Sequence, residues 1–387
     1  MLKVSDRSDI SPFIVMDVMR MSAAREAAGE HVLHLEVGQP DTPAPLAVRA
    51  AARAAINTDK IGYTVALGLD ALRERIARHY KDFYDLDVRA ENVVTTSGAS
   101  GGFVLAVLAA FDPGDRVAIA SPGYPCYRNT LTSLGIEPVV VPVSGTDRFQ
   151  LTPELLDHVG PIDGVVVASP SNPTGTLIEA PKLSALAEWC RSKGVRLVSD
   201  EIYHGITFGG HRATTAIEYS PGAIVVNSFS KYFSMTGWRL GWLVAPQDLV
   251  RPIERLIQNL YIAAPTLSQL AGVAAFDCYE EMDQHVAHYA RNRDILLEGL
   301  PAAGISDLAP ADGAFYIYAN ASHLTSDSLE FCRKLLAETN IAITPGVDFD
   351  RDRGHQAIRF SYAGATEDVA EAVVRIREWL SRSDRSK

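Results

Sequence analysis

One stretch of the chain decides the fold: Ser228-Phe229-Ser230-Lys231-Tyr232-Phe233-Ser234-Met235-Thr236-Gly237-Trp238-Arg239-Leu240-Gly241. It follows an apolar run, residues 223–227, that predicts a buried strand. Burial at the end of such a strand disfavours the charged form of Lys231, so its amine can attack a carbonyl. Ser228, Ser230 and Arg239 supply hydroxyl groups and a planar cation, which suit a phosphate group. Taken alone, the stretch is more typical of an exposed loop, so its meaning depends on the rest of the chain.

Working outward, four more β-rich runs alternate with helical segments, at residues 92–96, 116–120, 164–168 and 195–199. Each run, like 223–227, is followed by glycine, proline, hydroxyl, amide or carboxylate residues. Alternation of this kind predicts an α/β fold with a mostly parallel, mixed sheet and helices on both faces. Open α/β sheets bind ligands beyond the carboxyl ends of their strands. If the five strands are parallel, we expect the five polar clusters to meet in one crevice.

The chain is long enough for two domains, since 387 residues exceed what one small core organises. Residues 10–28 are expected to be helical and 32–37 to form a short strand. After residue 246 the chain is mainly helical, and from about Gly299 its pattern changes to a smaller α+β unit. We therefore predict a large ligand-binding domain over residues 41–285. A small domain would combine residues 1–40 with residues 286–387.

Composition excludes several classes of partner and site. A formal net charge of −11 argues against nucleic acid or anionic lipid as a partner. The N-terminus lacks the apolar core of a signal peptide, and the apolar run at 103–111 is too short to cross a bilayer. His31 and His34 lack clustered partner ligands, so we expect no metal site. The four cysteines lie far apart, which favours a reducing cytoplasm over a disulfide framework: Cys126, Cys190, Cys278 and Cys332.

The polar clusters supply the chemistry that Lys231 needs. A carboxylate at Asp200 would keep a pyridine nitrogen protonated, and Asn172 and Tyr203 could donate to a phenolate oxygen on the same ring. The Gly98-Ala99-Ser100 turn opens a helix and offers backbone N–H groups to a phosphate. A nucleophilic lysine beside a phosphate site is how proteins hold pyridoxal phosphate. Each residue alone also fits an ordinary turn or helix cap, so the prediction rests on their convergence.

Four separated motifs resemble a known family. They are Ser171-Asn172-Pro173-Thr174-Gly175, Asp200-Glu201-Ile202-Tyr203, Ser228-Phe229-Ser230-Lys231 with Arg239, and Ile358-Arg359-Phe360-Ser361. In order and spacing the chain resembles the class I/II aminotransferases of the fold-type I pyridoxal-phosphate superfamily. The resemblance extends from Gly38 to Leu380.

The resemblance implies a role for each matching residue. Lys231 would form the Schiff base and move the substrate proton, and Asp200 would pair with the pyridine nitrogen. Asn172 and Tyr203 would bind the ring oxygen, and Tyr124 would stack on the ring. Tyr63 would reach the phosphate of a neighbouring subunit, which implies a homodimer. Arg359, aided by the Gly38 backbone, would bind the substrate carboxylate. The remaining phosphate ligands would be Ala99, Ser100, Ser228, Ser230 and Arg239.

The predicted activity is transfer of an amino group from an L-amino acid to a 2-oxo acid by a ping-pong mechanism. No second cation stands out for a distal carboxylate, which favours neutral donors such as alanine or aromatic and aliphatic amino acids. Phe13, Ile14, Tyr261 and Tyr316 could supply apolar or aromatic surface around the side chain.

Three alternatives remain at this stage. A lyase on the same scaffold, such as a cysteine-conjugate β-lyase or an aminocyclopropane carboxylate synthase, could keep the same cofactor residues. A regulator with an aminotransferase-like sensor domain would need a DNA-binding domain, but only about 35 residues precede Gly38 and they show no basic helix-turn-helix pattern. A non-catalytic binding protein would be expected to lose Lys231 or Asp200, and both are present.

Overall fold

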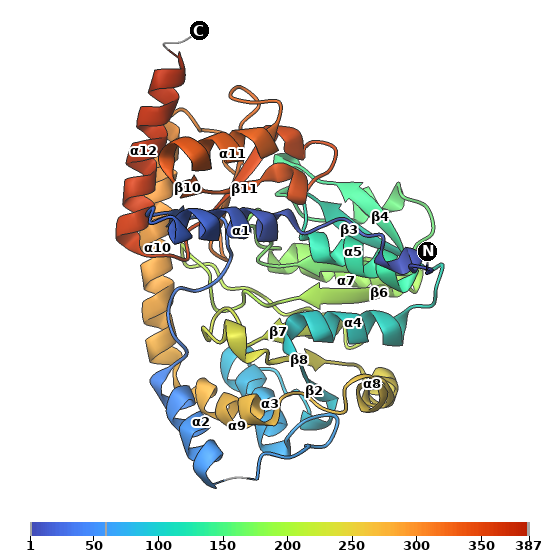
Figure 1. Ribbon diagram of the computed structural model, residues 1–387. Helices are drawn as coiled ribbons and strands as arrows, with labels where there is room; N and C mark the ends of the chain where they lie inside the picture. The colour runs from blue at the N-terminus through green and yellow to red at the C-terminus, as the bar shows by residue number, and fades with distance from the viewer. Residues whose placement is uncertain (1, 59, 385–387) are drawn as a thin grey trace.

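A seven-stranded sheet forms the centre of the molecule (Figure 1). The computed structural model describes residues 2–58 and 60–384. The strand order is β2-β8-β7-β6-β5-β3-β4. The strands are β2 (Val93–Thr96), β3 (Arg116–Ser121), β4 (Glu137–Pro142), β5 (Gly164–Ala168), β6 (Arg196–Asp200), β7 (Ile224–Ser228) and β8 (Gly241–Val244).

Six of these strands run in the same direction. Strands β3 to β7 pair in parallel. Strand β8 lies between β7 and β2 and is antiparallel to both, so β2 runs in the same direction as β3 to β7. The five strands expected from sequence are therefore parallel, and their carboxyl ends lie along one edge of the sheet. This confirms the predicted mixed, mostly parallel sheet.

Helices cover both faces of this sheet because successive strand residues point to opposite sides. In β5, Val165 and Val167 pack into one core and Val166 packs into the other. In β6, Leu197 and Val198 divide in the same way. One core includes α4 (Gly98–Ala110), α5 (Pro125–Leu134) and α8 (Gln247–Leu260). The other includes α2 (Leu46–Thr58), α3 (Asp70–Tyr84), α6 (Pro153–Asp157), α7 (Ala180–Lys193), α9 (Thr266–Gly272) and α10 (Tyr279–Ala302).

A smaller α+β unit is built mainly from the C-terminal part of the chain. Its three-stranded antiparallel sheet contains β9 (Tyr316–Asn320), β11 (Thr344–Pro345) and β12 (Ala357–Ser361). The N-terminal strand β1 (Leu33–His34) joins this unit by pairing in parallel with β10 (Ile341–Ala342). Its helices are α11 (Ser328–Thr339) and α12 (Thr366–Asp384). Helix α10 continues across residue 285, so the exact boundary between the two predicted domains stays a prediction.

The remaining N-terminal helix, α1 (Ile14–Ala27), packs against β10 and β11. In Figure 1 it lies between the small unit and the helices of the central sheet. The helix begins four residues later than expected, and the predicted strand at 32–37 is only two residues long. The mainly helical stretch expected after residue 246 includes a 3-10 turn at Val273–Asp277, between α9 and α10. No described helix is both long and apolar enough to cross a membrane.

Candidate active site

Lys231 follows β7 and reaches into the crevice at the carboxyl edge of the sheet. Its Nζ donates a hydrogen bond of 2.6 Å to the carbonyl oxygen of Gly38. Burial and, to a smaller extent, the positive charges of Arg359 and Arg239 lower the pKa of Lys231 to about 8, against the opposing effect of Asp200. The neutral, nucleophilic form of the amine is therefore favoured far more than in an exposed lysine.

Asp200 ends the neighbouring strand β6 and lies almost fully buried. The hydroxyl of Tyr127 donates to its Oδ2 at 2.6 Å, and the amide of Ile202 donates to its Oδ1 at 3.1 Å. Burial raises the pKa of Asp200 to about 6, even though these two hydrogen bonds and the charge of Lys231 act in the opposite direction. The carboxylate is thus held in one orientation and remains largely ionised at neutral pH.

Two tyrosines meet beside Lys231. The hydroxyl groups of Tyr203 and Tyr316 share a hydrogen bond of 2.7 Å. Burial raises the pKa of both hydroxyl groups above the usual value for tyrosine. A Cβ at Gly38 would overlap the Tyr316 hydroxyl, so only glycine allows the backbone at this position to lie so close to the Tyr316 side chain. The same backbone accepts the hydrogen bond from Lys231.

Arg359, in β12, brings a buried guanidinium into the crevice from the small unit. Its Nη1 donates to Asn172 Oδ1 at 2.8 Å, and its Nη2 donates to the Glu36 carbonyl and to Thr344. Its central carbon lies 4.4 Å from the centroid of the Tyr316 ring. The Nε atom is buried and has no hydrogen-bond partner among the described residues. A buried guanidinium with a free donor is suited to binding an anion.

The opposite end of the crevice collects hydroxyl groups and a second arginine. Ser228 Oγ donates to Ser230 Oγ at 2.8 Å, and both serines are buried. Arg239 lies at the N-terminus of α4, where a Cβ at Gly98 would come within 2.5 Å of its Nη2. Helix N-termini carry unpaired N–H groups and partial positive charge. This end of the crevice is therefore suited to binding a dianion such as a phosphate.

The crevice has two connected compartments of about 140 and 210 Å³. Gly38, Asn172, Tyr203, Tyr316 and Arg359 line the first compartment. The second is lined at its far end by the phosphate-type groups Ala99, Ser100, Ser228, Ser230 and Arg239. Five residues border both compartments and thus lie between the two ends: Tyr124, Tyr127, Asp200, Ile202 and Lys231. All but one of the residues expected to bind the cofactor or the substrate carboxylate, Tyr63, therefore line a single crevice.

Comparison with known proteins identifies the family. The model of aminotransferase class I and II matches residues 30–376. The chain belongs to the class I/II aminotransferases. This is a family that depends on pyridoxal phosphate, as the resemblance in the sequence implied.

Relatives of this aminotransferase match it over nearly its whole length. It is 51% identical over 382 residues to the valine–pyruvate aminotransferase of Mycobacterium tuberculosis, with 98% of each chain covered. A crystal structure of an aminotransferase from Mycobacterium tuberculosis aligns with a TM-score of 0.97 at 50% identity, covering 99% of this chain and 100% of that one. The aspartate aminotransferase of Thermus thermophilus with maleate aligns with a TM-score of 0.92 at 29% identity, covering 98% and 100%. The predicted fold-type I architecture is confirmed.

Three expected residues lie away from the crevice. Tyr63 is 83% exposed and lines neither compartment of its own chain. Ile14 packs on a small apolar cluster with Val18, and Tyr261 packs on the core beneath α8, so neither borders the crevice. Phe13 and Tyr316, which were expected to offer aromatic surface, do line the first compartment.

Sequence reasoning missed several residues that shape the crevice of this aminotransferase. Tyr127 received no role, although it lies one helical turn after Tyr124 and donates to Asp200. Thr344, which accepts from Arg359, comes from a strand of only two residues. Val15, Met16 and Met19 line the first compartment from α1. The only signal for these three was their apolar spacing on a helix.

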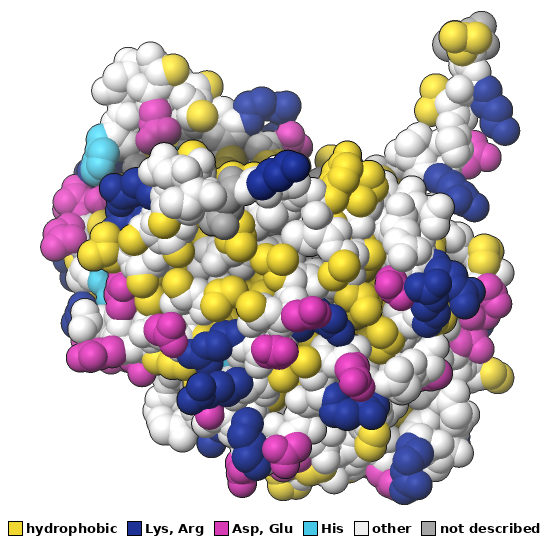
Figure 2. All heavy atoms as spheres, turned by 90° about the horizontal axis from the view of Figure 1, so that it is seen from below, with side chains coloured by type: hydrophobic (Ala, Val, Ile, Leu, Met, Phe, Trp, Pro, Cys, Tyr) yellow, Lys and Arg dark blue, Asp and Glu magenta, His cyan; other side chains and the backbone are white. Residues whose placement is uncertain are grey.

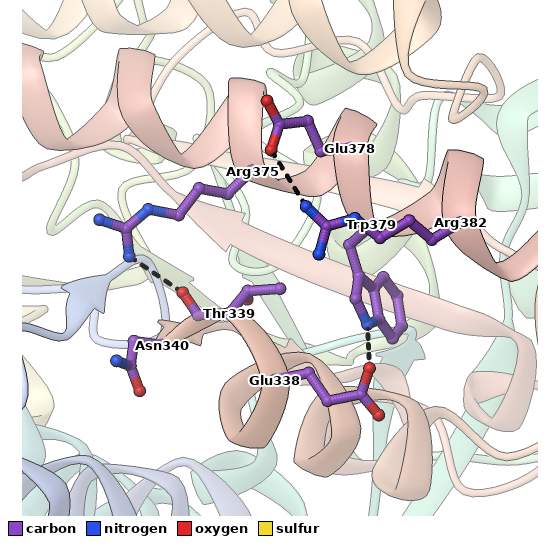
Figure 3. Close-up of a pocket in the computed structure, with 7 residues that line it drawn as sticks. All are labelled: Glu338, Thr339, Asn340, Arg375, Glu378, Trp379 and Arg382. Carbon is purple, nitrogen blue, oxygen red and sulfur yellow. Dashed lines mark hydrogen bonds and ion pairs between the residues drawn. The ribbon is translucent and has the colours of Figure 1, made fainter.

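A larger cavity of about 520 Å³ lies elsewhere, between α11 and α12 (Figure 3). Some of its polar groups already form hydrogen bonds with one another: Arg375 donates to the Thr339 carbonyl at 3.0 Å, and Trp379 Nε1 donates to Glu338 Oε2 at 2.7 Å. None of the residues expected at the active site borders it. Volume alone therefore does not locate the chemistry in this protein.

Proposed function

We propose that this aminotransferase transfers the amino group of a neutral L-amino acid to a 2-oxo acid through Lys231, by a ping-pong reaction. The observation that carries the proposal is the position of Arg359. Its guanidinium, with an unpartnered Nε, borders the same compartment as the Lys231 amine. A carboxylate bound to Arg359 would place the adjacent Cα of an amino acid near that amine.

The residues at the far end of the crevice fit pyridoxal phosphate. The hydroxyl groups of Ser228 and Ser230, the α4 N-terminus and Arg239 would hold the phosphate, and Asp200 would pair with the pyridine nitrogen. Tyr124 would face the ring, while Asn172 and Tyr203 would donate to its oxygen. When bound, the cofactor supplies an electron-withdrawing ring that makes the Cα proton of the substrate acidic.

Lys231 would then act as the base and acid of the reaction. With its pKa lowered to about 8, the amine can remove the Cα proton at a pH near neutrality and return it on the other side of the transfer. Asp200, held by Tyr127 and the Ile202 amide, would keep the ring nitrogen protonated throughout. The carbonyl of Gly38 accepts from the lysine and fixes its direction.

The walls of the first compartment support a neutral donor. Apart from Lys231 and Arg359, the described residues that line it carry no positive charge that could pair with a distal carboxylate. Its side-chain wall is apolar, with Val15, Met16 and Met19 contributed by α1 and Phe13 by the residue directly before this helix. The name of the Mycobacterium tuberculosis relative, valine–pyruvate aminotransferase, supports a small aliphatic donor and pyruvate as the acceptor.

A homodimer would complete the site. Tyr63 and its neighbours Ile61 and Val65 are exposed, and so are the apolar side chains of Leu46, Ile56, Leu260 and Ile262. Figure 2 shows the underside of the view in Figure 1, where hydrophobic side chains form patches between charged ones. We propose that a second copy covers this surface and brings its Tyr63 to the phosphate end of the crevice. The dispersed cysteines support a cytoplasmic location.

The decisive test is the visible spectrum of the holoenzyme mixed with single amino acids in the absence of any 2-oxo acid. We expect valine or alanine to convert the yellow form of the cofactor to the colourless pyridoxamine form and to release one equivalent of the 2-oxo acid. Aspartate at the same concentration should convert it much more slowly, because the apolar wall would leave its distal carboxylate unpaired.

Three results would contradict this proposal. Rapid conversion by aspartate would replace the neutral substrate class with an acidic one. Continuous release of ammonia and a 2-oxo acid, with the yellow form surviving, would show a lyase instead of a transaminase. A protein that binds no pyridoxal phosphate at all would exclude both reactions.

A further inference from the structure

Helix α1 has two apolar sides with different neighbours. Ile14 and Val18 pack with residues of the small unit, in a cluster that includes Val32, Leu336 and Ala342. Val15 and Met19, on an adjacent side of the helix, line the first compartment of the crevice together with Met16. Phe13, directly before the helix, contacts Tyr124 edge-on with ring centroids 5.7 Å apart. The first turn of α1 is therefore a wall of the compartment assigned to the substrate side chain.

The N-terminus of this helix is capped by a residue far away in the sequence. The residue before the helix is Phe13, which has no side-chain group to accept a hydrogen bond. Instead, the amide of Ile14 donates to Asp348 Oδ1 and the amide of Val15 donates to Asp348 Oδ2, both at 3.1 Å. Asp348 is 2% exposed and lies in the short 3-10 turn after β11. Both carboxylate oxygens are thus committed to the first two amides of α1.

The other end of α1 is anchored independently. Arg25 Nε donates to Asn340 Oδ1 at 2.7 Å, and His34 lies between Glu26 Oε1 and Glu36 Oε1 at 3.2 and 2.8 Å. These contacts, together with the cluster around Val18, hold the C-terminal half of the helix on the small unit. Loss of the Asp348 cap would therefore loosen the first turn, which carries the crevice wall, and leave the rest of the helix in place.

We propose that Asp348 is a positioning residue for substrate specificity, which holds the first turn of α1 so that its apolar side chains select among neutral amino acids. The proposal rests on the proposed function, because it assumes that the substrate side chain occupies the first compartment. Asp348 does not line the crevice and would not touch the substrate. It would act through the position of Phe13, Val15 and Met16.

The size of the effect should depend on the substrate. A pocket typically discriminates by about 10–200-fold for each methylene that it contacts. The two extra methyl groups of valine need a well-placed wall, whereas the single methyl group of alanine needs it much less. Loosening the first turn should thus raise the KM for valine more than that for alanine and leave kcat nearly unchanged.

The test compares Asp348→Asn with the wild-type holoenzyme, using L-valine and L-alanine as donors. Asparagine keeps the shape of the side chain but retains only one acceptor oxygen. We expect the ratio of kcat/KM for valine to that for alanine to fall by about fivefold or more. Asp352→Asn is the matched control, because Asp352 is an exposed carboxylate of the same loop, four residues after Asp348. This control should keep the wild-type ratio.

A second pair of variants separates the hydrogen bond from the charge of Asp348, which lies near Arg359 and Arg128. Ile14→Pro removes the amide that donates to Oδ1, and proline is well tolerated at the first position of a helix. Phe13 is already extended, as a residue before proline must be. Ile14→Ala removes the same side chain and keeps the amide. We expect Ile14→Pro to lower the valine-to-alanine ratio below that of Ile14→Ala, and this comparison also decides the matter if Asp348→Asn does not fold.

Hydrogen exchange gives a readout that does not depend on activity. In the cofactor-free protein, Asp348→Asn should speed exchange of the amides at residues 14–16 by at least about tenfold and leave those near Arg25 unchanged. Equal losses for valine and alanine, with unchanged exchange in the first turn, would overturn the role of Asp348. A wild-type protein that prefers aspartate would instead overturn the proposed substrate class, and the exchange data would still decide whether Asp348 holds α1.

Discussion

Lys231 owes its reactivity to its surroundings. Burial and two nearby arginines lower its pKa to about 8 from the usual 10.5. Because a lowered pKa means that the amine loses its proton at a lower pH, the nucleophilic form is already abundant at pH 8. We predict that the rate at which the cofactor-free protein reacts with pyridoxal rises with pH, has its midpoint near pH 8 and levels off about one to two pH units higher. Stopped-flow absorbance measures this rate, and pyridoxal avoids titration of a phosphate.

Arg359 gives a matched control for this prediction. Arg359→Met removes a positive charge that lowers the lysine pKa, so the midpoint of the pH profile should move upwards. Arg359→Lys keeps the charge and should move it little. A midpoint close to 10 in the wild-type protein would show that Lys231 is not desolvated as the structure indicates.

Tyr127 acts on the other charged group of the crevice. Its hydrogen bond to Asp200 opposes the effect of burial, which still raises the pKa of this carboxyl to about 6. Tyr127→Phe removes a hydrogen bond to a charged group, typically worth about 1.5–3 kcal/mol, so the pKa should rise by about one to two units. Protonated Asp200 cannot pair with a pyridinium. We therefore predict that the variant binds pyridoxal phosphate several-fold more weakly at pH 6.5 than the wild-type protein does.

The pH dependence distinguishes this effect from general damage. At pH 8.5 Asp200 should be ionised in both proteins, so the affinities for pyridoxal phosphate, measured by fluorescence titration, should converge. An equal loss of affinity at both pH values would mean that Tyr127 contributes packing and not charge stabilisation.

Among the elements, the N-terminus of α4 is the one most dependent on a single residue. Gly98 has a φ of +75°, and a Cβ there would approach Arg239 Nη2 within 2.5 Å. Gly98→Ala would add backbone strain of about 1–2 kcal/mol and push the guanidinium away from the proposed phosphate position. We predict that affinity for pyridoxal phosphate falls by at least about tenfold, since a charge-assisted hydrogen bond is lost.

Pyridoxal, which lacks the phosphate, is the control for this variant. Its binding should change much less, because the strain lies at the phosphate end of the crevice. If both compounds lost affinity equally in equilibrium titrations, the substitution would have damaged the whole site and not the phosphate cradle.

The elements also show what the sequence could predict. The five parallel strands were found within about one residue because buried strands are apolar and end in turn residues. Asn172, Asp200 and Lys231 each lie at or shortly after the end of one of these strands. Because parallel strands end at the same edge of a sheet, the sequence predicted that these three residues lie close together. Strand β8 was missed because its four residues, Gly241–Val244, run directly on from the lysine motif without a turn signal of their own.

Contacts between distant segments could not be predicted in this way. Tyr127 and Asp200 are 73 residues apart, and Ile14 and Asp348 are 334 apart. Local periodicity says whether a residue lies on a helix or strand but not which side chain from elsewhere reaches it. The late start of α1 illustrates this, because a cap from Asp348 and not a local signal marks its first residue.

At the scale of the whole molecule, the open question is where Tyr63 acts. It is 83% exposed and lies outside the crevice of its own chain, among other exposed apolar residues. In a two-fold dimer, the same surface of each subunit meets its counterpart, so each Tyr63 could serve the other site. Loss of its hydroxyl contact with a phosphate would cost about 1.5–3 kcal/mol. Tyr63→Phe should therefore lower cofactor affinity by about tenfold or more without changing the dimer.

Subunit mixing tests this arrangement directly. Lys231→Ala inactivates a site from within its own chain, whereas Tyr63→Phe would weaken the site of the neighbour. A hybrid of the two would hold one site with Lys231 from one chain and Tyr63 from the other, and thus one complete site. At limiting pyridoxal phosphate, we predict that unfolding and refolding an equal mixture restores roughly a quarter of wild-type activity, because half of the dimers are hybrids with one complete site of two. If the mixture stayed as inactive as its components, Tyr63 would serve its own chain or no site at all.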